Sequence, residues 1–396
     1  MKVLFVSHMF PSASRTTLGT FVRDYADAIR NSGIEVGVLR LATALAWPIG
    51  SFGYYRTSGR ILASEAPNVR AIKFPVLPAL AAFNIYSART QNRITEAAVE
   101  FKPDIIHSHN LFPDAALSIA AKKATNARLV VTTHGTDNRV HIHRSSRLRW
   151  VEQALAETDH LIAVSGKILR EFSEAGIYPR KCSVIYNGFS QGPRSAEVTK
   201  RPGRTALCVC HLDLIEKGVD ILIQAFGRLH SSQEFVDCRL VIVGAGRKSG
   251  KLKALANAVG VGASTEFMGA LEPSGVHEEF ARCDLFCMPS WYEAFGVVYL
   301  EAMSHGKPVI AVAGQGISEV LRDGETALLV EPRSIESCTA ALERLFRDPV
   351  LRERIGSAGL RRVAQFTWEH AAAETVAIYE DLLAGVRRPP TGHSFT

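Results

Sequence analysis

Short apolar runs alternate along the whole chain with longer stretches in which apolar residues recur every three or four positions. Within residues 19–31, Val22, Tyr25, Ala26 and Ile29 fall on one face of a predicted helix. Short runs that are apolar throughout are typical of strands buried on both faces of a sheet. Such strands, alternating with amphipathic helices, predict a parallel sheet covered by helices on both sides.

Two alternating series follow each other, separated by a polar segment rich in glycine and proline. The strands predicted in the first series are Val3–Ser7, Glu35–Leu39, Val69–Phe74, Ile105–His107, Leu129–Thr133, Leu161–Val164 and Ser183–Tyr186. Those predicted in the second are Thr205–His211, Arg239–Val243, Thr265–Met268, Asp284–Met288, Pro308–Val312 and Ala327–Val330. The sequence therefore predicts an α/β protein of two doubly wound, Rossmann-like domains, residues 1–188 and 205–366, joined by a linker at 189–204. Because parallel sheets bind ligands at the carboxyl ends of their strands, we expect the domains to face a central cleft that holds the ligand.

The end of the chain carries one more helical pattern. Residues 367–385 place Trp368, Ala372, Tyr379 and Leu383 on one side of a predicted helix. Because an apolar stripe needs a surface to cover, this helix is predicted to cross back onto the first domain.

Length and composition fit a two-domain globular protein. The 396 residues, 47% apolar and 21% charged, exceed the size at which a single core stops growing. The net charge of +7 is compatible with acidic small molecules, an anionic membrane surface or nucleic acid as partners. Nucleic acid is not expected, because no basic motif interleaved with aromatic residues is present.

The N-terminus and the cysteines indicate the compartment. The apolar run Val3–Val6 is too short for a signal peptide and fits a first buried strand. The seven cysteines form no C-x-x-C pair and resemble buried apolar residues in a reducing environment. We therefore expect a cytoplasmic protein.

The most informative chemistry lies in residues 291–311. Glu293 and Glu301 stand eight positions apart, with Gly296 between them, after a predicted buried strand. This order predicts a strand, a short loop and a helix N-terminus, whose unpaired N–H groups bind anions. Glycine lets the backbone come close to a ligand. A phosphate flanked by two carboxylates that bind hydroxyls suggests a nucleotide sugar, whereas the alternative is a solvated helix face that carries two glutamates.

Other candidate residues stand near predicted strand ends. Lys217 is predicted to open a helix, where the helix dipole does not favour a cation, so an anionic ligand is favoured over a solvated lysine. Gly246 belongs to a glycine-rich turn that matches a dinucleotide-binding fingerprint only weakly, and we interpret it as a tight turn at the ligand cleft. No Asp-x-Asp motif occurs, and His141 and His143 stand among arginines without a further ligand, so we expect no metal.

Further short motifs occur in both series. They are Gly19, the segments 103–109, 134–137, 184–188, 216–218 and 243–246, the pair Glu293 and Glu301, and Glu319 after Gly314-Gln315-Gly316. Each motif alone is weak, but their order and spacing together resemble family 4 glycosyltransferases of the two-Rossmann-domain (GT-B) type. The resemblance covers almost the whole chain.

The resemblance implies roles for residues of the second domain. It implies that Glu301 binds the ribose of the donor nucleotide, that Glu293 binds hydroxyls of the donor sugar, and that Lys217 stabilises the diphosphate. Backbone N–H groups around Phe295, Gly296 and Val297 would hold the sugar and the distal phosphate, and Met268 would belong to the turn that binds the base. His211 stands where the family usually has an arginine, so leaving-group stabilisation would depend more on Lys217.

The resemblance implies a second set of residues in the first domain. His134 would contact the donor sugar and act with Glu293 and Lys217 as a catalytic residue, although a lone histidine is more often structural. His109 and Asp137 would lie on the acceptor side, and His109 is as readily a core histidine. Gly19 would line the donor site, but the paired glycines usual in this loop appear here as Leu18-Gly19.

The implied activity is transfer of a sugar, with retention of anomeric configuration, from a nucleoside diphosphate sugar to a glycan or lipid-linked acceptor, in cell-surface polysaccharide or glycolipid synthesis. No cofactor beyond the donor is implied. Alternatives are a nucleotide-sugar epimerase of the same architecture and a non-catalytic glycan-binding or partner subunit. The aromatic loop Trp47–Tyr55 predicts contact with an anionic membrane on its cytoplasmic face, or equally ordinary loop packing.

Overall fold

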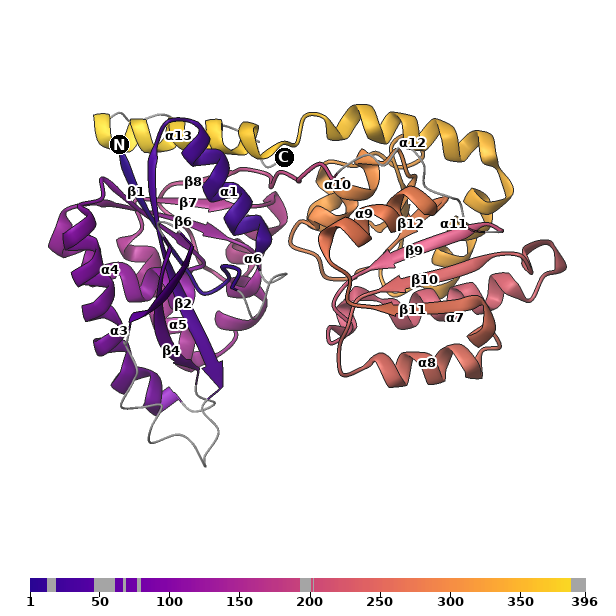
Figure 1. The fold of residues 1–396 in the computed structure, drawn as a ribbon, viewed down its shortest axis with the longest axis horizontal. Coiled ribbons are helices and arrows are strands. Elements are labelled where there is room, and N and C mark those ends of the chain that lie inside the picture. Colours follow the sequence, from indigo (N-terminus) through magenta and orange to yellow (C-terminus); the bar gives the residue numbers. More distant parts are fainter. Residues whose placement is uncertain are drawn as a thin grey trace. The chain divides into compact units, whose positions relative to one another are not determined.

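The computed structural model describes residues 1–12, 19–45, 61–66, 69–76, 80–192, 201 and 203–385. The chain forms two compact units (Figure 1). Unit 1 comprises Met1–Gly188 together with the chain from Trp368 onward, and unit 2 comprises Phe189–Thr367. The predicted cleft between the domains stays a prediction.

Unit 1 is built on a sheet whose described strands run in the order β3-β4-β2-β1-β5-β6-β7-β8. Neighbouring strands are parallel except β3, which pairs antiparallel with β4. The strands are β1 (Lys2–Ser7), β2 (Glu35–Leu45), β3 (Ile61–Ala66), β4 (Val69–Val76), β5 (Ile105–His109), β6 (Arg128–Thr133), β7 (His160–Ala163) and β8 (Cys182–Val184). The sequence pattern missed β3, because this edge strand lacks the continuous apolar run of the central strands.

Helices cover both faces of this sheet (Figure 1). The helices are α1 (Thr20–Asn31), α3 (Leu80–Phe101), α4 (Ala116–Thr125), α5 (Ser145–Glu157), α6 (Gly166–Glu174) and α13 (Trp368–Ala384), with two short π-helical turns, η1 (Leu111–Ala115) and η2 (Asp137–His141). The central strand β1 is almost wholly buried, and its Phe5 pairs with Val38 of β2 on one side and with His107 of β5 on the other. A strand buried on both faces explains why its sequence is a continuous apolar run.

The C-terminal helix α13 belongs to unit 1, as predicted, and packs against α1. Its buried residues are Trp368, Ala371, Ala372, Thr375 and Tyr379. Leu383 follows Tyr379 by four residues and so lies on the predicted side, but 46% of its surface is exposed. Leu382 packs against the core instead, since one helical position turns the side chain by about 100°.

Unit 2 carries a second sheet, with the order β11-β10-β9-β12-β13-β14 and only parallel pairs. Its strands are β9 (Thr205–Val209), β10 (Arg239–Val243), β11 (Thr265–Gly269), β12 (Leu285–Cys287), β13 (Val309–Val312) and β14 (Leu328–Val330). Its helices are α7 (Val219–His230), α8 (Ser249–Ala258), α9 (Pro273–Arg282), α10 (Val297–Ser304), α11 (Ile335–Arg347) and α12 (Pro349–Val363).

The described parts of the predicted linker belong to unit 2. Arg201 pairs with the buried Glu279 at 3.0 Å, and a side chain at Gly192 would overlap the ring of His277. Phe189 forms a β-bridge with Thr367, so the two ends of unit 2 run side by side. The boundary therefore lies between residues 188 and 189.

Each sheet reverses its strand order beside its first strand. In unit 1, β1 lies between β2 and β5, and in unit 2, β9 lies between β10 and β12. The loops that leave the carboxyl ends of these strands diverge to opposite faces, which creates a crevice where ligands of open α/β sheets bind. The residues after β1 and β5, and those after β9 and β12, are therefore the first candidates for the site.

Replacing Tyr379 by phenylalanine tests the attachment of α13. The Tyr379 hydroxyl is hydrogen-bonded to Nδ1 of the buried His107. Tyr379→Phe is expected to lower the free energy of unfolding by about 1–3 kcal/mol, because it leaves a buried polar atom without its partner. The exposed control Leu383→Ala is expected to change it by less than about 0.5 kcal/mol. Equal effects of the two substitutions in urea denaturation would contradict this packing.

Candidate active site

An ion pair joins the loops after β9 and β12 of unit 2. Lys217 Nζ donates to Glu293 Oε2 at 2.6 Å, and both side chains are largely buried. Burial lowers the pKa of Lys217, but the charge and the hydrogen bond of Glu293 outweigh it, so that the pKa is raised. The site therefore keeps a charged ammonium beside a carboxylate.

Lys217 does not open the helix, contrary to the sequence prediction. It ends a 3₁₀ turn, Ile215–Lys217, and α7 begins two residues later at Val219. Gly218 separates them in a left-handed conformation, φ 68°. A Cβ at this position would lie 2.2 Å from the carbonyl oxygen of Pro289, so glycine is required for the two loops to meet.

Backbone hydrogen bonds hold Glu293 in place. Its N–H donates to Gln315 Oε1 and its carbonyl accepts from the Gly316 N–H, each at 3.0 Å. The loop after β12 is also tied to the Lys217 segment, because the Trp291 N–H donates to the Glu216 carbonyl at 2.9 Å. The Lys217–Glu293 geometry is thus fixed by the loops that follow β9, β12 and β13.

Helix α10 begins directly after this pair, as predicted. Gly296 precedes it with φ 92°, and a Cβ there would lie 2.7 Å from the Tyr299 ring and 3.0 Å from Glu293 Cγ. Phe295 is buried in the core, so only its backbone is available to a ligand. Val297 provides the first helical N–H, and Glu301 lies four residues further on in a partly exposed position. A helix N-terminus beside a lysine favours an anion.

The remaining candidates of unit 2 have different surroundings. His211 is exposed in the loop after β9. A Cβ at Gly246 would lie 2.5 Å from the Asp213 N–H, so this glycine lets the loop after β10 pack against the loop after β9. Met268, in β11, is partly buried, and its sulfur lies 3.8 Å from an Arg201 nitrogen.

Three histidine rings stack at the carboxyl edge of the unit 1 sheet. The rings of His107 and His109 are 4.7 Å apart, and those of His109 and His134 are 5.3 Å apart. His109 Nδ1 and His134 Nε2 share a hydrogen bond of 3.1 Å. Burial lowers the pKa of His107 and of His134 to about 3, so both rings are neutral at physiological pH.

His109 and His134 each have one buried ring nitrogen that accepts or donates no hydrogen bond within the described residues. In the described part of the chain, neither His109 Nε2 nor His134 Nδ1 has a hydrogen-bond partner. His109 is fully buried, whereas His134 is partly exposed. His134 therefore reaches the surface of unit 1, and His109 packs behind it.

Asp137 is fully buried, so it supports the site from behind. Its carboxylate accepts the N–H groups of Leu111 at 2.8 Å and Phe112 at 3.1 Å, and the Thr133 hydroxyl at 3.2 Å. Burial raises the pKa of Asp137 to about 6. These bonds fix the turn η1, and the placement of Asp137 on the acceptor side stays a prediction.

Gly19 is fixed by a close backbone approach. It precedes α1 with φ 70°, and a Cβ there would lie 1.4 Å from the Met9 carbonyl oxygen. No sequence motif indicated His8, which stands next to Met9 and whose ring is hydrogen-bonded to Asp114 of η1. The available signal was that His8 and Asp114 follow adjacent parallel strands, β1 and β5.

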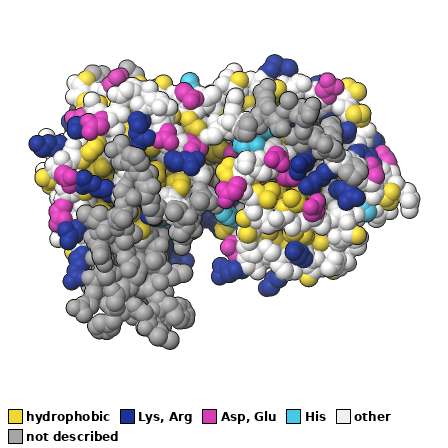
Figure 2. All heavy atoms as spheres, in the orientation of Figure 1, with side chains coloured by type: hydrophobic (Ala, Val, Ile, Leu, Met, Phe, Trp, Pro, Cys, Tyr) yellow, Lys and Arg dark blue, Asp and Glu magenta, His cyan; other side chains and the backbone are white. Residues whose placement is uncertain are grey.

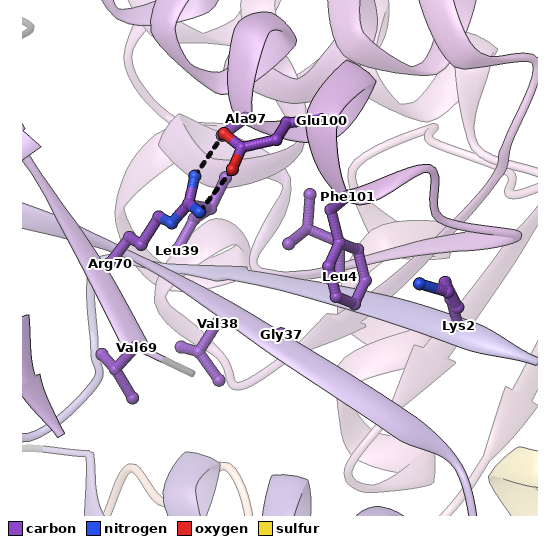
Figure 3. Close-up of a pocket in the computed structure, with 10 residues that line it drawn as sticks. All are labelled: Lys2, Leu4, Gly37, Val38, Leu39, Val69, Arg70, Ala97, Glu100 and Phe101. Atoms are coloured by element: carbon purple, nitrogen blue, oxygen red, sulfur yellow. Dashed lines mark hydrogen bonds and ion pairs between the residues drawn. The ribbon is translucent and has the colours of Figure 1, made fainter. Parts of the chain in front are cut away.

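A cavity of about 360 Å³ lies elsewhere in unit 1 (Figure 3). It is lined from the amino-terminal halves of β1, β2 and β4 and from the end of α3, with the Arg70–Glu100 ion pair at its rim. Ligands of such sheets bind at the opposite, carboxyl edge. We therefore do not assign this cavity to the active site.

None of the described helices is long and apolar enough to cross a bilayer. The loop Trp47–Tyr55 lies outside the described residues. Figure 2 shows basic and acidic side chains interspersed on the visible faces of both units. Among the described residues, no group of three His, Cys, Asp or Glu side chains is placed to hold a metal ion.

Two doubly wound units, one with a Lys–Glu pair at a helix N-terminus, define a glycosyltransferase of the two-Rossmann-domain class. Residues 195–362 match the family model described as Glycosyl transferases group 1, and residues 18–190 match the model Glycosyltransferase Family 4. The chain belongs to the family 4 glycosyltransferases. The predictions of this family, of the two-domain α/β fold and of a transferase activity are confirmed.

Known relatives cover most of the chain. A phosphatidyl-myo-inositol mannosyltransferase of Mycobacterium leprae is 28% identical over 369 residues, which are 88% of this chain and 92% of that protein. A glycogen synthase of Mycobacterium tuberculosis is 27% identical over 404 residues, 98% of this chain and 97% of that protein.

Solved structures share the fold. The sucrose-phosphate synthase of Thermosynechococcus elongatus superposes with a TM-score of 0.79 at 20% identity, covering 97% of this chain and 99% of that one. HepE of Anabaena, in complex with UDP and glucose, superposes with a TM-score of 0.76 at 18% identity, covering 96% and 100%.

The neutral histidines predict acid sensitivity. Above pH 6.5, His134 is neutral in the folded and the unfolded chain; below that value the unfolded chain binds a proton that the folded chain does not bind until about pH 3. Stability is therefore present above pH 6.5 and is lost as the pH falls, by about 1.4 kcal/mol per pH unit for each such histidine. His134→Gln is expected to reduce this slope in urea denaturation, and the exposed control His143→Gln is not. Parallel slopes for wild type and His134→Gln would contradict the buried, neutral state.

Proposed function

We propose that the protein transfers a sugar from a nucleoside diphosphate sugar to a hydroxyl of a glycan or lipid-linked acceptor, with retention of anomeric configuration. The observation that carries the donor class is the Lys217–Glu293 ion pair at the start of α10. Its support from relatives is that HepE was solved with UDP and glucose, and that the Mycobacterium leprae relative is named a phosphatidyl-myo-inositol mannosyltransferase.

Lys217 and the first turn of α10 are proposed to bind the diphosphate. As the sugar–phosphate bond breaks, negative charge grows on the leaving oxygen, and a fixed ammonium with backbone N–H groups stabilises it. Glu293 keeps Lys217 charged in the largely buried site. The exposed His211 provides at most one charge, and only when protonated, so Lys217 supplies the main cation.

Glu293, Glu301 and His134 are proposed to orient the donor. Among the described residues, Glu293 Oε1 accepts no hydrogen bond, while Oε2 binds Lys217. Glu293 can therefore accept a bond from a sugar hydroxyl without releasing Lys217. Glu301, which is partly exposed on α10, is proposed to bind the ribose, and His134, whose Nδ1 has no partner among the described residues, is proposed to bind the sugar. In a retaining transfer, the acceptor hydroxyl attacks on the face from which the phosphate departs.

Substitutions of the ion pair test this proposal. Lys217→Ala and Glu293→Ala are each expected to reduce turnover by about 10²–10³-fold, because each removes charge stabilisation or sugar orientation in the transition state. Release of free nucleoside diphosphate from UDP-, GDP- and ADP-sugars is the measurement, with circular dichroism to verify the fold. The exposed control Lys251→Ala is expected to retain wild-type turnover. Near-normal rates in both pair variants would refute the assigned roles.

Calorimetric titration of UDP, GDP and ADP separates the alternatives. A transferase is expected to bind one of the three, and Lys217→Ala to weaken that binding. A non-catalytic subunit would bind none of them tightly. An epimerase would convert the donor without an acceptor and without releasing free nucleoside diphosphate. Either pattern in the wild-type protein would overturn the transferase mechanism proposed here.

A lipid-linked acceptor would bring the protein to a membrane surface. The net charge of +7 favours an anionic one, at the cytoplasmic face. We expect the protein to float with vesicles that contain anionic lipid, and to do so less as ionic strength rises, because the attraction is screened by salt. Vesicles of neutral lipid alone are the control. A protein that stays wholly in the soluble fraction with anionic vesicles would remove the membrane proposal.

A further inference from the structure

A run of basic residues follows β6 at the carboxyl edge of the unit 1 sheet. Residues 139–149 contain four arginines and two histidines but no aspartate or glutamate. The run spans the end of η2 and the first turns of α5, and α5 packs against η1, which follows β5. Open α/β sheets bind ligands at this edge, so the run stands where a ligand of unit 1 is expected.

Arg147 has the most defined surroundings in this run. The residue is only partly exposed, and its guanidinium lies over the Phe112 ring, 5.5 Å from the ring centre. Its Nη1 donates to His141 Nδ1 at 3.0 Å. These contacts distinguish Arg147 from an arginine that is solvated on all sides. They hold the guanidinium in one orientation, which is what a binding site for an anion requires.

The partners of Arg147 do not neutralise its charge. His141 is buried, and burial together with the positive charges around the ring lowers its pKa to about 3, so that it is neutral. Those charges are Arg147, His8 and Arg144. Burial and the neighbouring Arg144 also lower the pKa of the Arg147 guanidinium. Among the described residues, no carboxylate lies within ion-pair distance of either Arg144 or Arg147.

The start of α5 adds to this positive field. Arg144 is at the N-cap position, Arg147 lies in the first turn, and that turn contains no acidic residue. A helix N-terminus carries a partial positive charge, so cations are unfavourable there unless an anion is bound. Elsewhere in unit 1, Arg70 is paired with Glu100. Arg144 and Arg147 thus lack the counter-charge that a bound anion supplies.

We propose that Arg144 and Arg147 form a binding site for a phosphate group on unit 1. The inference deepens the proposed function and rests on it in one respect, namely that the ligand that carries this phosphate is the acceptor. The N–H groups of Arg147 that do not bond His141 donate to phosphate oxygens, and Arg144 supplies a second positive charge. A phosphate monoester carries a charge of about −1.5 to −2 at neutral pH, which matches two guanidinium groups better than a carboxylate does.

Calorimetric titration with glycerol 1-phosphate tests the site. The nucleoside diphosphate that the protein binds is kept at saturation, so that the phosphate site at Lys217 in unit 2 is occupied. The wild-type protein is expected to bind glycerol 1-phosphate and not glycerol. Arg147→Gln is expected to weaken this binding by about tenfold or more, because charge-assisted hydrogen bonds are lost. Arg144→Gln is expected to weaken it by about three- to tenfold, because one of two positive charges is lost.

Arg149→Gln is the matched control. Arg149 is exposed on the same helix, and its replacement removes the same charge, but side chains two positions apart on a helix do not face each other. Its affinity for glycerol 1-phosphate is expected to stay within about twofold of wild type, because a charge in solvent is screened. Equal weakening by Arg147→Gln and Arg149→Gln would reduce the effect to diffuse charge and overturn the site.

Vesicles distinguish two sources of the phosphate group. Flotation is compared for phosphatidylcholine vesicles that contain phosphatidic acid and for vesicles that contain oleate at equal surface charge. If Arg147→Gln weakens flotation with phosphatidic acid alone, the phosphate belongs to a lipid headgroup. If Arg147→Gln weakens only the binding of glycerol 1-phosphate, the ligand is a water-soluble phosphate ester. Both results support the site, and a wild-type protein that binds neither probe would overturn it.

The outcomes distinguish this site from the function on which it rests. If the wild-type protein binds no nucleoside diphosphate, the titration is made without it; phosphate binding that depends on Arg147 then keeps the site while the proposed function fails. If nucleotide release depends on Lys217 but phosphate binding does not depend on Arg147, the site is overturned and the transfer stands. Circular dichroism verifies the fold of each variant. Should Arg147→Gln not fold, the comparison of the exposed Arg144→Gln with Arg149→Gln decides.

Discussion

The contact between Lys217 and Glu293 depends on how closely two backbone loops of unit 2 approach each other. Lys217 Nζ and Glu293 Oε2 lie 2.6 Å apart because Gly218 adopts a left-handed conformation and leaves space for the carbonyl of Pro289. Gly296 is also left-handed, at the start of α10, and a Cβ there would clash with the side chains of Tyr299 and Glu293. Glycine at these two positions therefore has a geometric cause, since any side chain would separate the ammonium, the carboxylate and the helix terminus.

Burial gives the two units opposite electrostatic character. In unit 2, Glu293 overcomes the effect of burial and keeps Lys217 charged. Among the described residues of unit 1, no carboxylate is hydrogen-bonded to His107 or His134, so burial lowers the pKa of each to about 3 and both are neutral. His8 differs from these two, because Asp114 is directly paired with it. A buried side chain with a carboxylate partner, such as Lys217, stays charged and suits a diphosphate. Buried histidines without such a partner stay neutral and suit a sugar.

Much of the fold could be predicted from sequence because parallel strands buried on both faces are continuous apolar runs. Strand Arg239–Val243 was predicted with its observed bounds, and the return of α13 to unit 1 was predicted from its apolar stripe. The edge strand Ile61–Ala66 lacks such a run and was missed. Leu383 lies on the predicted side of α13 but is 46% exposed near the end of the helix, because no described part of the core covers the stripe that far.

The sequence by itself determined the class of the fold, the family and the residue types of the donor site, because these follow from local periodicity and from the spacing of short motifs. Only the tertiary structure decided which side chains are accessible. It buried Asp137, which is hydrogen-bonded to the backbone of η1. It also brought His8 within hydrogen-bond distance of Asp114, which lies 106 positions away along the chain. Burial and pairing depend on contacts between distant segments, and the order of residues along one segment does not contain that information.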